Sequence, residues 1–211
     1  MTEAASVTTF VMGPRLPWAE DVPESGELGP FDAAVILDGS ARKDCSIRKI
    51  SALGATIRIG AGKPAASEVS VELATGQRVI ATVDWAEAGE IGARFKQPID
   101  VLALINRKLV SQPGDRRAMP RVEIRCAAYV KRGEDFLAAT VRNVSARGLQ
   151  LEGDALPPVG SYVSLFVEGL NVPPGEVAWR KDDLAGIELF EELRWSSIMP
   201  WIREQMRKQP Q

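Results

Sequence analysis

The chain has 211 residues, 45% of them hydrophobic, which is enough to bury one large core or two small ones. Its net charge of −2 excludes the broad positive field that non-specific nucleic-acid binders carry, so nucleic acid is not an expected partner. Histidine is absent, and with it the commonest general base and a common metal ligand. We therefore expect neither an enzyme nor a metal site.

The first 28 residues show little periodicity, and residues 1–28 are predicted to form a flexible N-terminal arm. This segment has no basic start and only a short apolar stretch, unlike a signal peptide. No stretch of the chain approaches the roughly 18 consecutive apolar residues of a membrane span. These features predict a cytoplasmic protein without membrane insertion.

Residues 29–112 are predicted to form the first of two domains. Short strand-like segments separated by turn residues fill most of it, and QPIDVLALINRKLV follows them with the spacing of an amphipathic helix. Cys45 in this domain and Cys126 in the next have no second thiol at a metal-ligand spacing. We expect both to be small buried side chains and expect no disulfide.

An internal repeat relates the two halves of the chain at a constant offset of 94 residues. The segment IRKISALGATI from Ile47 aligns with VRNVSARGLQL from Val141, and VDW from Val83 aligns with VAW from Val177. Between residues 34 and 95, fourteen positions are identical to the position 94 residues later. The repeat predicts a duplicated domain.

Residues 113–211 are predicted to form the second domain. The connector SQPGDRRAMPR leads into it, and its proline, glycine and charges are typical of a hinge. From Val122 to Val130, apolar and polar residues mostly alternate, as in a strand with one buried face. Turns follow at the spacing of an antiparallel barrel or sandwich, and SIMPWIREQMRKQ predicts a final helix. Trp195 and Trp201 on that helix could form a docking face, although their spacing favours a place in the core.

The predicted fold class is therefore mainly β, with two tandem small antiparallel six-stranded β-barrels, each followed by a C-terminal α-helix.

Two short motifs stand in a fixed order in the second domain. The segment Arg117-Ala-Met-Pro-Arg121 is followed 22 residues later by Asn143-Val-Ser-Ala-Arg-Gly148. Together they resemble RxxxR and (D/N)xSxxG, the two-part signature of the PilZ domain, a bacterial receptor for cyclic di-GMP. Either motif alone is common in linkers and turns, so their order and separation carry the resemblance. It runs from about residue 116 to the final helix, and it reaches the first domain only through the repeat.

The resemblance implies a cyclic di-GMP site in the second barrel. Its predicted residues are Arg116, Arg117, Arg121, Asn143, Ser145, Arg147 and Gly148. A planar guanidinium contacts phosphate oxygens bidentately or stacks on a purine, and the Asn143 amide and Ser145 hydroxyl can bond to a guanine edge. Gly148 is expected to allow a positive φ and a close approach of a base, although the turn alone could require it. Arg147 is either an extra contact or an exposed arginine without a role.

The first copy departs from this pattern. Lys49 stands where the second copy has Asn143, and an ammonium group accepts no hydrogen bond. Residues 18–32 carry five acidic residues and no basic one, so this segment would repel phosphate. We predict a tandem arrangement whose degenerate first copy binds no nucleotide and keeps Ser51 and Gly54 only for the turn.

The favoured functional hypothesis is a cyclic di-GMP receptor and adaptor. Nucleotide would bind the second barrel, order the interdomain arginine segment and alter domain orientation to regulate a protein partner in motility, polysaccharide production or a related output. The sequence does not identify that partner, and cyclic di-GMP is the one small molecule expected, without a cofactor. The alternative is a ligand-free PilZ-like protein-interaction module, against which the intact motif pair argues. A barrel for single-stranded nucleic acid would need a basic groove lined with aromatic residues, and only 6% of the residues are aromatic.

Overall fold

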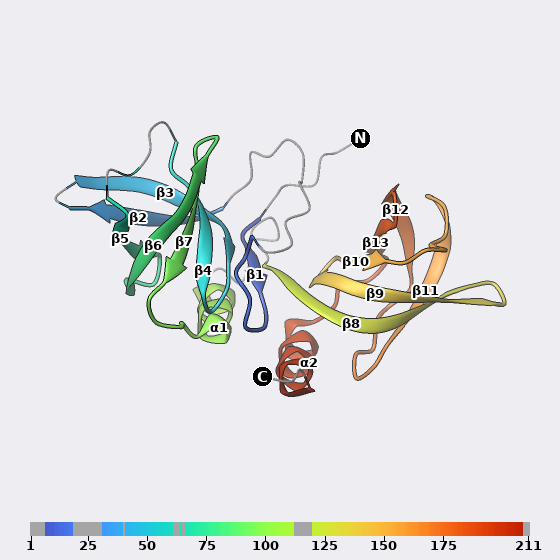
Figure 1. Cartoon of the computed structure of the whole chain (residues 1–211). Coiled ribbons are helices and arrows are strands. Elements are labelled where there is room, and N and C mark those ends of the chain that lie inside the picture. Colours follow the sequence, from blue (N-terminus) through green and yellow to red (C-terminus); the bar gives the residue numbers. More distant parts are fainter. Residues whose placement is uncertain are drawn as a thin grey trace. The chain divides into compact units, whose positions relative to one another are not determined.

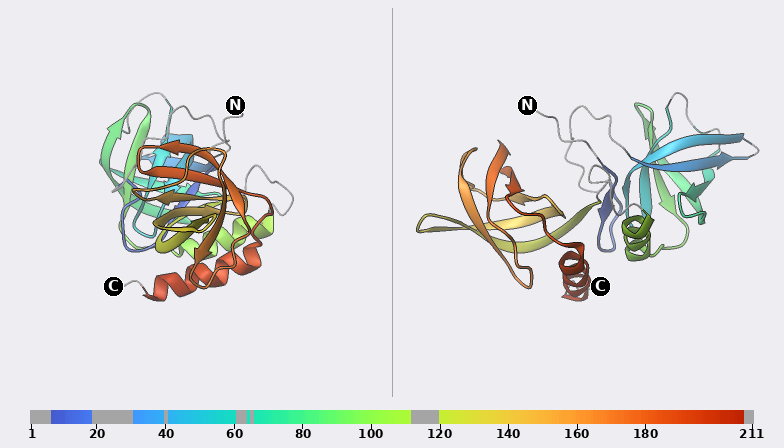
Figure 2. Two further views of the ribbon diagram at one scale, coloured as in Figure 1. Left: turned by 90° about the vertical axis from the view of Figure 1, so that its right-hand side faces the viewer. Right: turned by 180° about the vertical axis from the view of Figure 1, so that it is seen from behind.

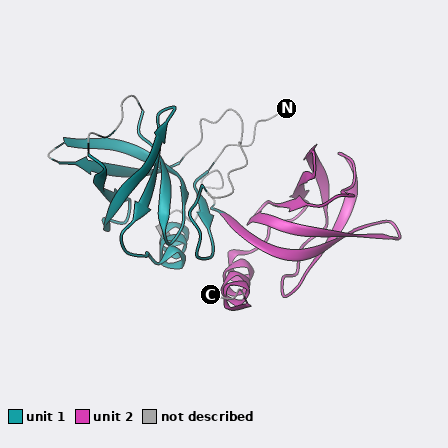
Figure 3. Ribbon diagram, viewed as in Figure 1, with its two compact units in different colours: residues 1–121 teal, residues 122–211 magenta. Residues whose placement is uncertain are grey.

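The computed structural model of the chain describes residues 7–18, 31–39, 41–60, 64, 66–111 and 120–208. The chain separates into two compact units, Met1–Arg121 and Val122–Gln211, which Figure 3 colours separately. Each unit contains a six-stranded barrel and a helix that follows it in the sequence (Figure 1).

Barrel 1 is built from β2 to β7 in the first unit. The elements of this unit are β1 (Thr9–Val11), β2 (Asp32–Asp38), β3 (Ala41–Ile50), β4 (Gly54–Arg58), β5 (Glu68–Leu73), β6 (Arg78–Glu87), β7 (Glu90–Phe95) and α1 (Val101–Ser111). Antiparallel pairing runs in the order β3-β2-β5-β6-β7-β4, and β4 pairs with β3 again. The sheet is therefore closed and leaves none of these six strands as an edge.

Barrel 2 is built from β8 to β13 in the second unit. Its elements are β8 (Arg121–Arg132), β9 (Asp135–Ser145), β10 (Gly148–Glu152), β11 (Tyr162–Val167), β12 (Gly175–Lys181), β13 (Leu184–Leu189) and α2 (Trp195–Lys208). The order β8-β9-β10-β13-β12-β11 closes where β11 pairs with β8, and every pairing is antiparallel. The predicted mainly β fold with closed six-stranded barrels and helices is confirmed.

The two barrels share their connectivity and also their irregularities. β4 and β10 begin 94 residues apart, at Gly54 and Gly148. In both barrels the second strand carries a bulge at the equivalent arginine, because the pairing skips Arg48 in one and Arg142 in the other. The last hairpin of each barrel has a non-glycine residue with positive φ at the same position. The sequence repeat thus corresponds to a repeat of the fold, down to single residues.

Each helix closes its unit with an apolar face. The Asp100 side chain caps α1 by accepting from the Ala103 amide at 3.0 Å, and Ile105 is fully buried. In α2, Trp201 is buried, and its indole donates to the Glu168 carbonyl at 2.9 Å. Trp201 therefore belongs to the core rather than to an exposed docking face. The turned views of Figure 2 show α1 and α2 as the two helices that follow the last strand of each barrel.

A short strand from the N-terminal segment adds to barrel 1. β1 pairs in parallel with the end of β3, where Thr9 lies opposite Lys49. The Thr8 hydroxyl donates to the Ile47 carbonyl at 2.7 Å, and residues 10–12 are buried. At these residues the chain is part of the first unit rather than an extended arm. Most of the remaining predicted arm lies outside the described residues.

Both cysteines are free, as the sequence predicts, but both are half-buried rather than fully buried. Burial raises the pKa of Cys45 to about 12 and that of Cys126 to about 11, with further contributions from nearby carboxylates. The two thiols therefore stay protonated near neutral pH, the form that neither attacks disulfides nor binds metal well. Within the part of the chain that the structure describes, no helix is long and apolar enough to cross a membrane.

Replacing Phe10 by alanine tests whether the N-terminal segment is a packed part of the first unit. The side chain is 2% exposed, so Phe10→Ala should lower the free energy of unfolding by about 3–5 kcal/mol, measured by urea denaturation. Val110→Ala is the control, because Val110 is 80% exposed and its truncation should change stability by less than about 0.5 kcal/mol. Equal stability of both variants would contradict the packing of β1.

Candidate functional site

The structure describes five of the seven predicted site residues. Arg116 and Arg117 lie outside the described residues. Arg121 is the first residue of β8, where Val122 is fully buried, so alternation along the strand turns Arg121 and Glu123 outward. Glu123 lies opposite Asn143 of β9, which puts Arg121 on the same outer face as the second motif.

The second motif forms the tight turn between β9 and β10. Ser145 and Gly148 face each other across this turn, and the Ser145 hydroxyl donates to the Gly148 carbonyl at 3.2 Å. In barrel 1 the Ser51 hydroxyl contacts the Gly54 carbonyl at 3.5 Å in the same turn. The serine is thus a structural part of the turn in both barrels, and its oxygen keeps lone pairs that can accept from a ligand.

The reason for glycine at position 148 differs from the sequence expectation. Positive φ occurs at Gly133, Gly160 and Gly169 in the second unit but not at Gly148, so that expectation is wrong. A Cβ on Gly148 would instead lie closer than 3.0 Å to the Ile187 carbonyl oxygen of β13. Glycine is needed because the third and last strands of the barrel approach closely here.

A side-chain hydrogen bond orients the motif asparagine. The Asn143 amide nitrogen donates to Gln150 Oε1, and the two residues lie opposite each other in the β9–β10 ladder. Both side chains are half-buried on the outer face. With its nitrogen engaged, the Asn143 amide presents its oxygen as the acceptor for a ligand N–H group.

Trp179 continues this row of side chains across the barrel. Gln150 lies opposite Gly186 of β13, and Gly186 lies opposite Trp179 of β12. The indole covers Gly186 so closely that a Cβ there would collide with Nε1. Trp179 is nevertheless 43% exposed, so one side of its ring is open for stacking. We call Asn143, Gln150, Gly186 and Trp179 the outer row.

Sequence reasoning missed Gln150 and Trp179 as site residues. The repeat aligns Trp85 with Trp179, which marks the position but not its neighbours. Gln150 stands two residues after Gly148, so strand alternation already places both on one face. The sequence does not reveal the strand register that places residues of β12, β13, β10 and β9 in a single row.

Two arginines near the motif have different surroundings. Arg142 is the bulge residue of β9, and its guanidinium lies 2.7 Å from Glu152 and is 11% exposed, which gives it a structural role. Arg147 at the turn is 64% exposed. Its guanidinium comes no closer than 3.9 Å to the Glu188 carboxylate and 4.0 Å to the Glu192 carboxylate. Such loose exposed pairs contribute little to stability, so Arg147 can exchange them for an anionic ligand.

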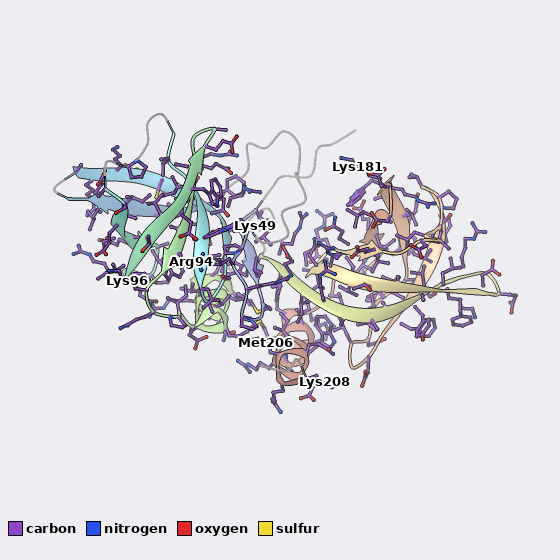
Figure 4. All side chains as sticks on the ribbon, viewed as in Figure 1. Lys49, Arg94, Lys96, Lys181, Met206 and Lys208 are labelled. Atoms are coloured by element: carbon purple, nitrogen blue, oxygen red, sulfur yellow. The ribbon has the colours of Figure 1, made fainter. Side chains whose placement is uncertain are left out.

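The same face of barrel 1 is covered by the chain itself. Lys49 and Thr56, which correspond to Asn143 and Gln150, are 7% and 0% exposed. β1 pairs with β3 at Lys49, which Figure 4 labels near β1. Trp18 packs edge-on against Trp85 at 6.1 Å between ring centroids and lies over Gly54. Residues of the N-terminal segment thus occupy the surface where barrel 2 is open.

Residues 115–197 match the family model of the PilZ domain. The match includes the arginine motif and barrel 2, so it confirms the resemblance for this part of the chain. It does not include barrel 1, whose assignment as a degenerate copy stays a prediction. No curated protein matches the chain in sequence.

Several solved structures are similar to the chain at low identity. PlzA of Borreliella burgdorferi in complex with c-di-GMP is 11% identical with a TM-score of 0.34, over 82% of this chain and 86% of that one. The inhibitor of motility MotI/DgrA of Bacillus subtilis is 15% identical with a TM-score of 0.32, over 85% and 98%. YcgR of Escherichia coli in complex with c-di-GMP is 11% identical with a TM-score of 0.25, over 84% and 81%. These values are too low to carry an argument about this chain.

The packing of Trp179 on Gly186 can be tested by substitution. Gly186→Ala should displace the indole and lower the free energy of unfolding by about 1–3 kcal/mol, measured by urea denaturation. Adding Trp179→Ala to the same chain removes the collision. Gly186→Ala should therefore lower the free energy of unfolding by less in the Trp179→Ala background than in the wild-type background. Additive losses in the double variant would contradict the contact.

Proposed function

We propose that barrel 2 binds cyclic di-GMP on its outer face and that the chain is a receptor for this nucleotide. One observation carries the proposal: the intact motif residues Asn143 and Ser145 lie on an accessible face of barrel 2, whereas the equivalent face of barrel 1 is covered by the chain's own residues 7–18. The family match of residues 115–197 supports the same assignment.

The base-recognition part of the proposed site is the outer row together with the turn. A guanine offers N–H donors on one edge and a flat π face. The Asn143 oxygen and the Ser145 hydroxyl accept from the edge, and the exposed side of Trp179 offers a stacking surface. Gly148 keeps the turn flat, because it carries no side chain above the backbone.

The phosphate part of the proposed site consists of arginines. Arg121 faces the same side as Asn143, and Arg116 and Arg117 precede it in the connector. Their planar guanidinium groups suit the two phosphates, because each can form paired charge-assisted hydrogen bonds. Arg147 would add a further cation when it leaves its exposed glutamate neighbours.

The arginine motif also links the two units, which gives the proposed site a way to signal. A ligand that contacts the connector would restrain the relative orientation of the barrels as part of binding. If it binds one orientation more tightly than the others, it shifts the equilibrium toward that orientation. The output is regulation of a protein partner.

Arginine substitutions test the proposed site. Charge-assisted hydrogen bonds contribute about 1.5–3 kcal/mol each, so Arg117→Ala or Arg121→Ala should weaken binding roughly ten- to a hundredfold in calorimetry with cyclic di-GMP. Arg203→Ala on the exposed side of α2 is the control and should leave affinity unchanged. Unchanged affinity in both site variants would refute the site. No binding by the wild-type chain would favour the ligand-free interaction module.

Hydrogen exchange tests the proposed coupling to the connector. Amides of residues 111–121 should exchange more slowly with cyclic di-GMP bound, and small-angle scattering of the same samples should show a changed distance distribution. Amides of α2 distant from the site serve as the internal reference. If nucleotide binds while both measurements stay unchanged, the receptor does not signal through the connector.

A further inference from the structure

Five aromatic side chains stand exposed on the outside of barrel 2. They are Tyr129, Phe136, Tyr162, Phe166 and Phe190, and each is more than half exposed. We call these five residues the aromatic face. Two ring pairs lie within it, with centroids 5.7 Å and 5.4 Å apart. Adjacent exposed aromatic residues of this kind are unusual on a monomer and are enriched at protein interfaces.

Barrel 1 carries charged residues at the positions equivalent to these two ring pairs. The positions equivalent to Phe136 and Phe166 hold Arg42 and Glu72, whose charged groups lie 3.7 Å apart. The positions equivalent to Tyr162 and Phe190 hold Glu68 and Lys96, which also form an ion pair, and Figure 4 labels Lys96 on this barrel. The fold therefore accepts ion pairs at both places, so its stability does not require aromatic residues there.

The middle of the aromatic face is the outer side of β11, with Tyr162 and Phe166 on either side of the small residue Ser164. Lys131 of β8 lies opposite Ser164, and Glu176 of β12 lies opposite Tyr162. A cation and an anion thus flank β11 on opposite sides. Lys131 lies 5.3 Å from the centre of the Phe136 ring, but among the residues that the structure describes neither it nor Glu176 has an ion-pair partner.

We propose that the aromatic face is the contact between two copies of this chain. A closed barrel has no strand edge to extend, so two copies must associate through side chains. A two-fold axis parallel to β11 lays each β11 on the other and each β8 over the other copy's β12. Tyr162 and Phe166 then pack on aromatic residues of the second copy, and Lys131 of each copy faces Glu176 of the other. Because the positive and the negative side chain lie on opposite sides of the axis, this surface is electrostatically complementary to the same surface of a second copy.

The contact shares β9 and β12 with the outer row, but its residues on these strands, Phe136 and Glu176, are not the outer-row residues Asn143 and Trp179. Self-association therefore does not depend on nucleotide binding, and the two can be measured separately.

Sedimentation of the full chain without nucleotide tests the dimer. The wild type should form a concentration-dependent dimer below roughly 100 µM protein. Phe136→Arg with Phe166→Glu installs the ion pair that barrel 1 tolerates and should weaken dimerisation at least about tenfold, with nucleotide affinity unchanged. Replacing both Arg42 and Glu72 by alanine changes the same positions of barrel 1 and should leave dimerisation unaltered.

Charge reversal then identifies the geometry of the contact. Lys131→Glu and Glu176→Lys should each weaken dimerisation, and the two together should restore it, because the swapped charges meet across the two-fold axis. A wild type that stays monomeric over this concentration range would overturn the proposal. So would a dimer that survives Phe136→Arg with Phe166→Glu, or a charge swap that does not restore association.

Discussion

Both barrels depend on the close approach of the third strand to the last strand beside one turn. Gly54 in barrel 1 and Gly148 in barrel 2 lie against backbone carbonyls of the last strand, where a Cβ would not fit. The last strand then bonds to the turn itself, because the amides of Phe95 and Leu189 donate to the carbonyls of Leu53 and Arg147 at 2.8 Å and 3.0 Å. This contact closes the barrel and fixes the turn that carries the second motif.

Because this scaffold is the same in both barrels, the proposed difference in nucleotide binding lies in what covers the outer face. In barrel 1 the N-terminal segment covers it, Lys49 and Thr56 are buried, and exposed charges elsewhere on the barrel form ion pairs with one another. Barrel 2 leaves Asn143 and Trp179 accessible and carries aromatic residues where barrel 1 has ion pairs. One outer face is covered by the chain's own residues, and the other is accessible for the proposed ligand.

The sequence predicted the fold well because the repeat and the strand alternation are local signals. The offset of 94 residues carries Gly54 to Gly148 and Val101 to Trp195, which are the observed starts of β4 and β10 and of α1 and α2. The burial of Phe10 was missed because β1 has three residues and no detectable period, so only its pairing with β3 makes it a strand.

The site was less predictable because its geometry depends on contacts between strands. The role of Gly148 was misassigned, since a close approach to Ile187 cannot be recognised from a local motif. Gln150 and Trp179 join the site through cross-strand register, which residue spacing along one strand does not reveal.

Because the outer face of barrel 1 is covered and that of barrel 2 is exposed, barrel 2 alone should bind the nucleotide. Calorimetry with cyclic di-GMP on two reciprocal variants tests it most directly. Wild type should show a single class of sites, Asn143→Lys should lower affinity by about a hundredfold or more, and Lys49→Asn should change neither affinity nor stoichiometry. A second class of sites in Lys49→Asn, or retained affinity in Asn143→Lys, would contradict the account.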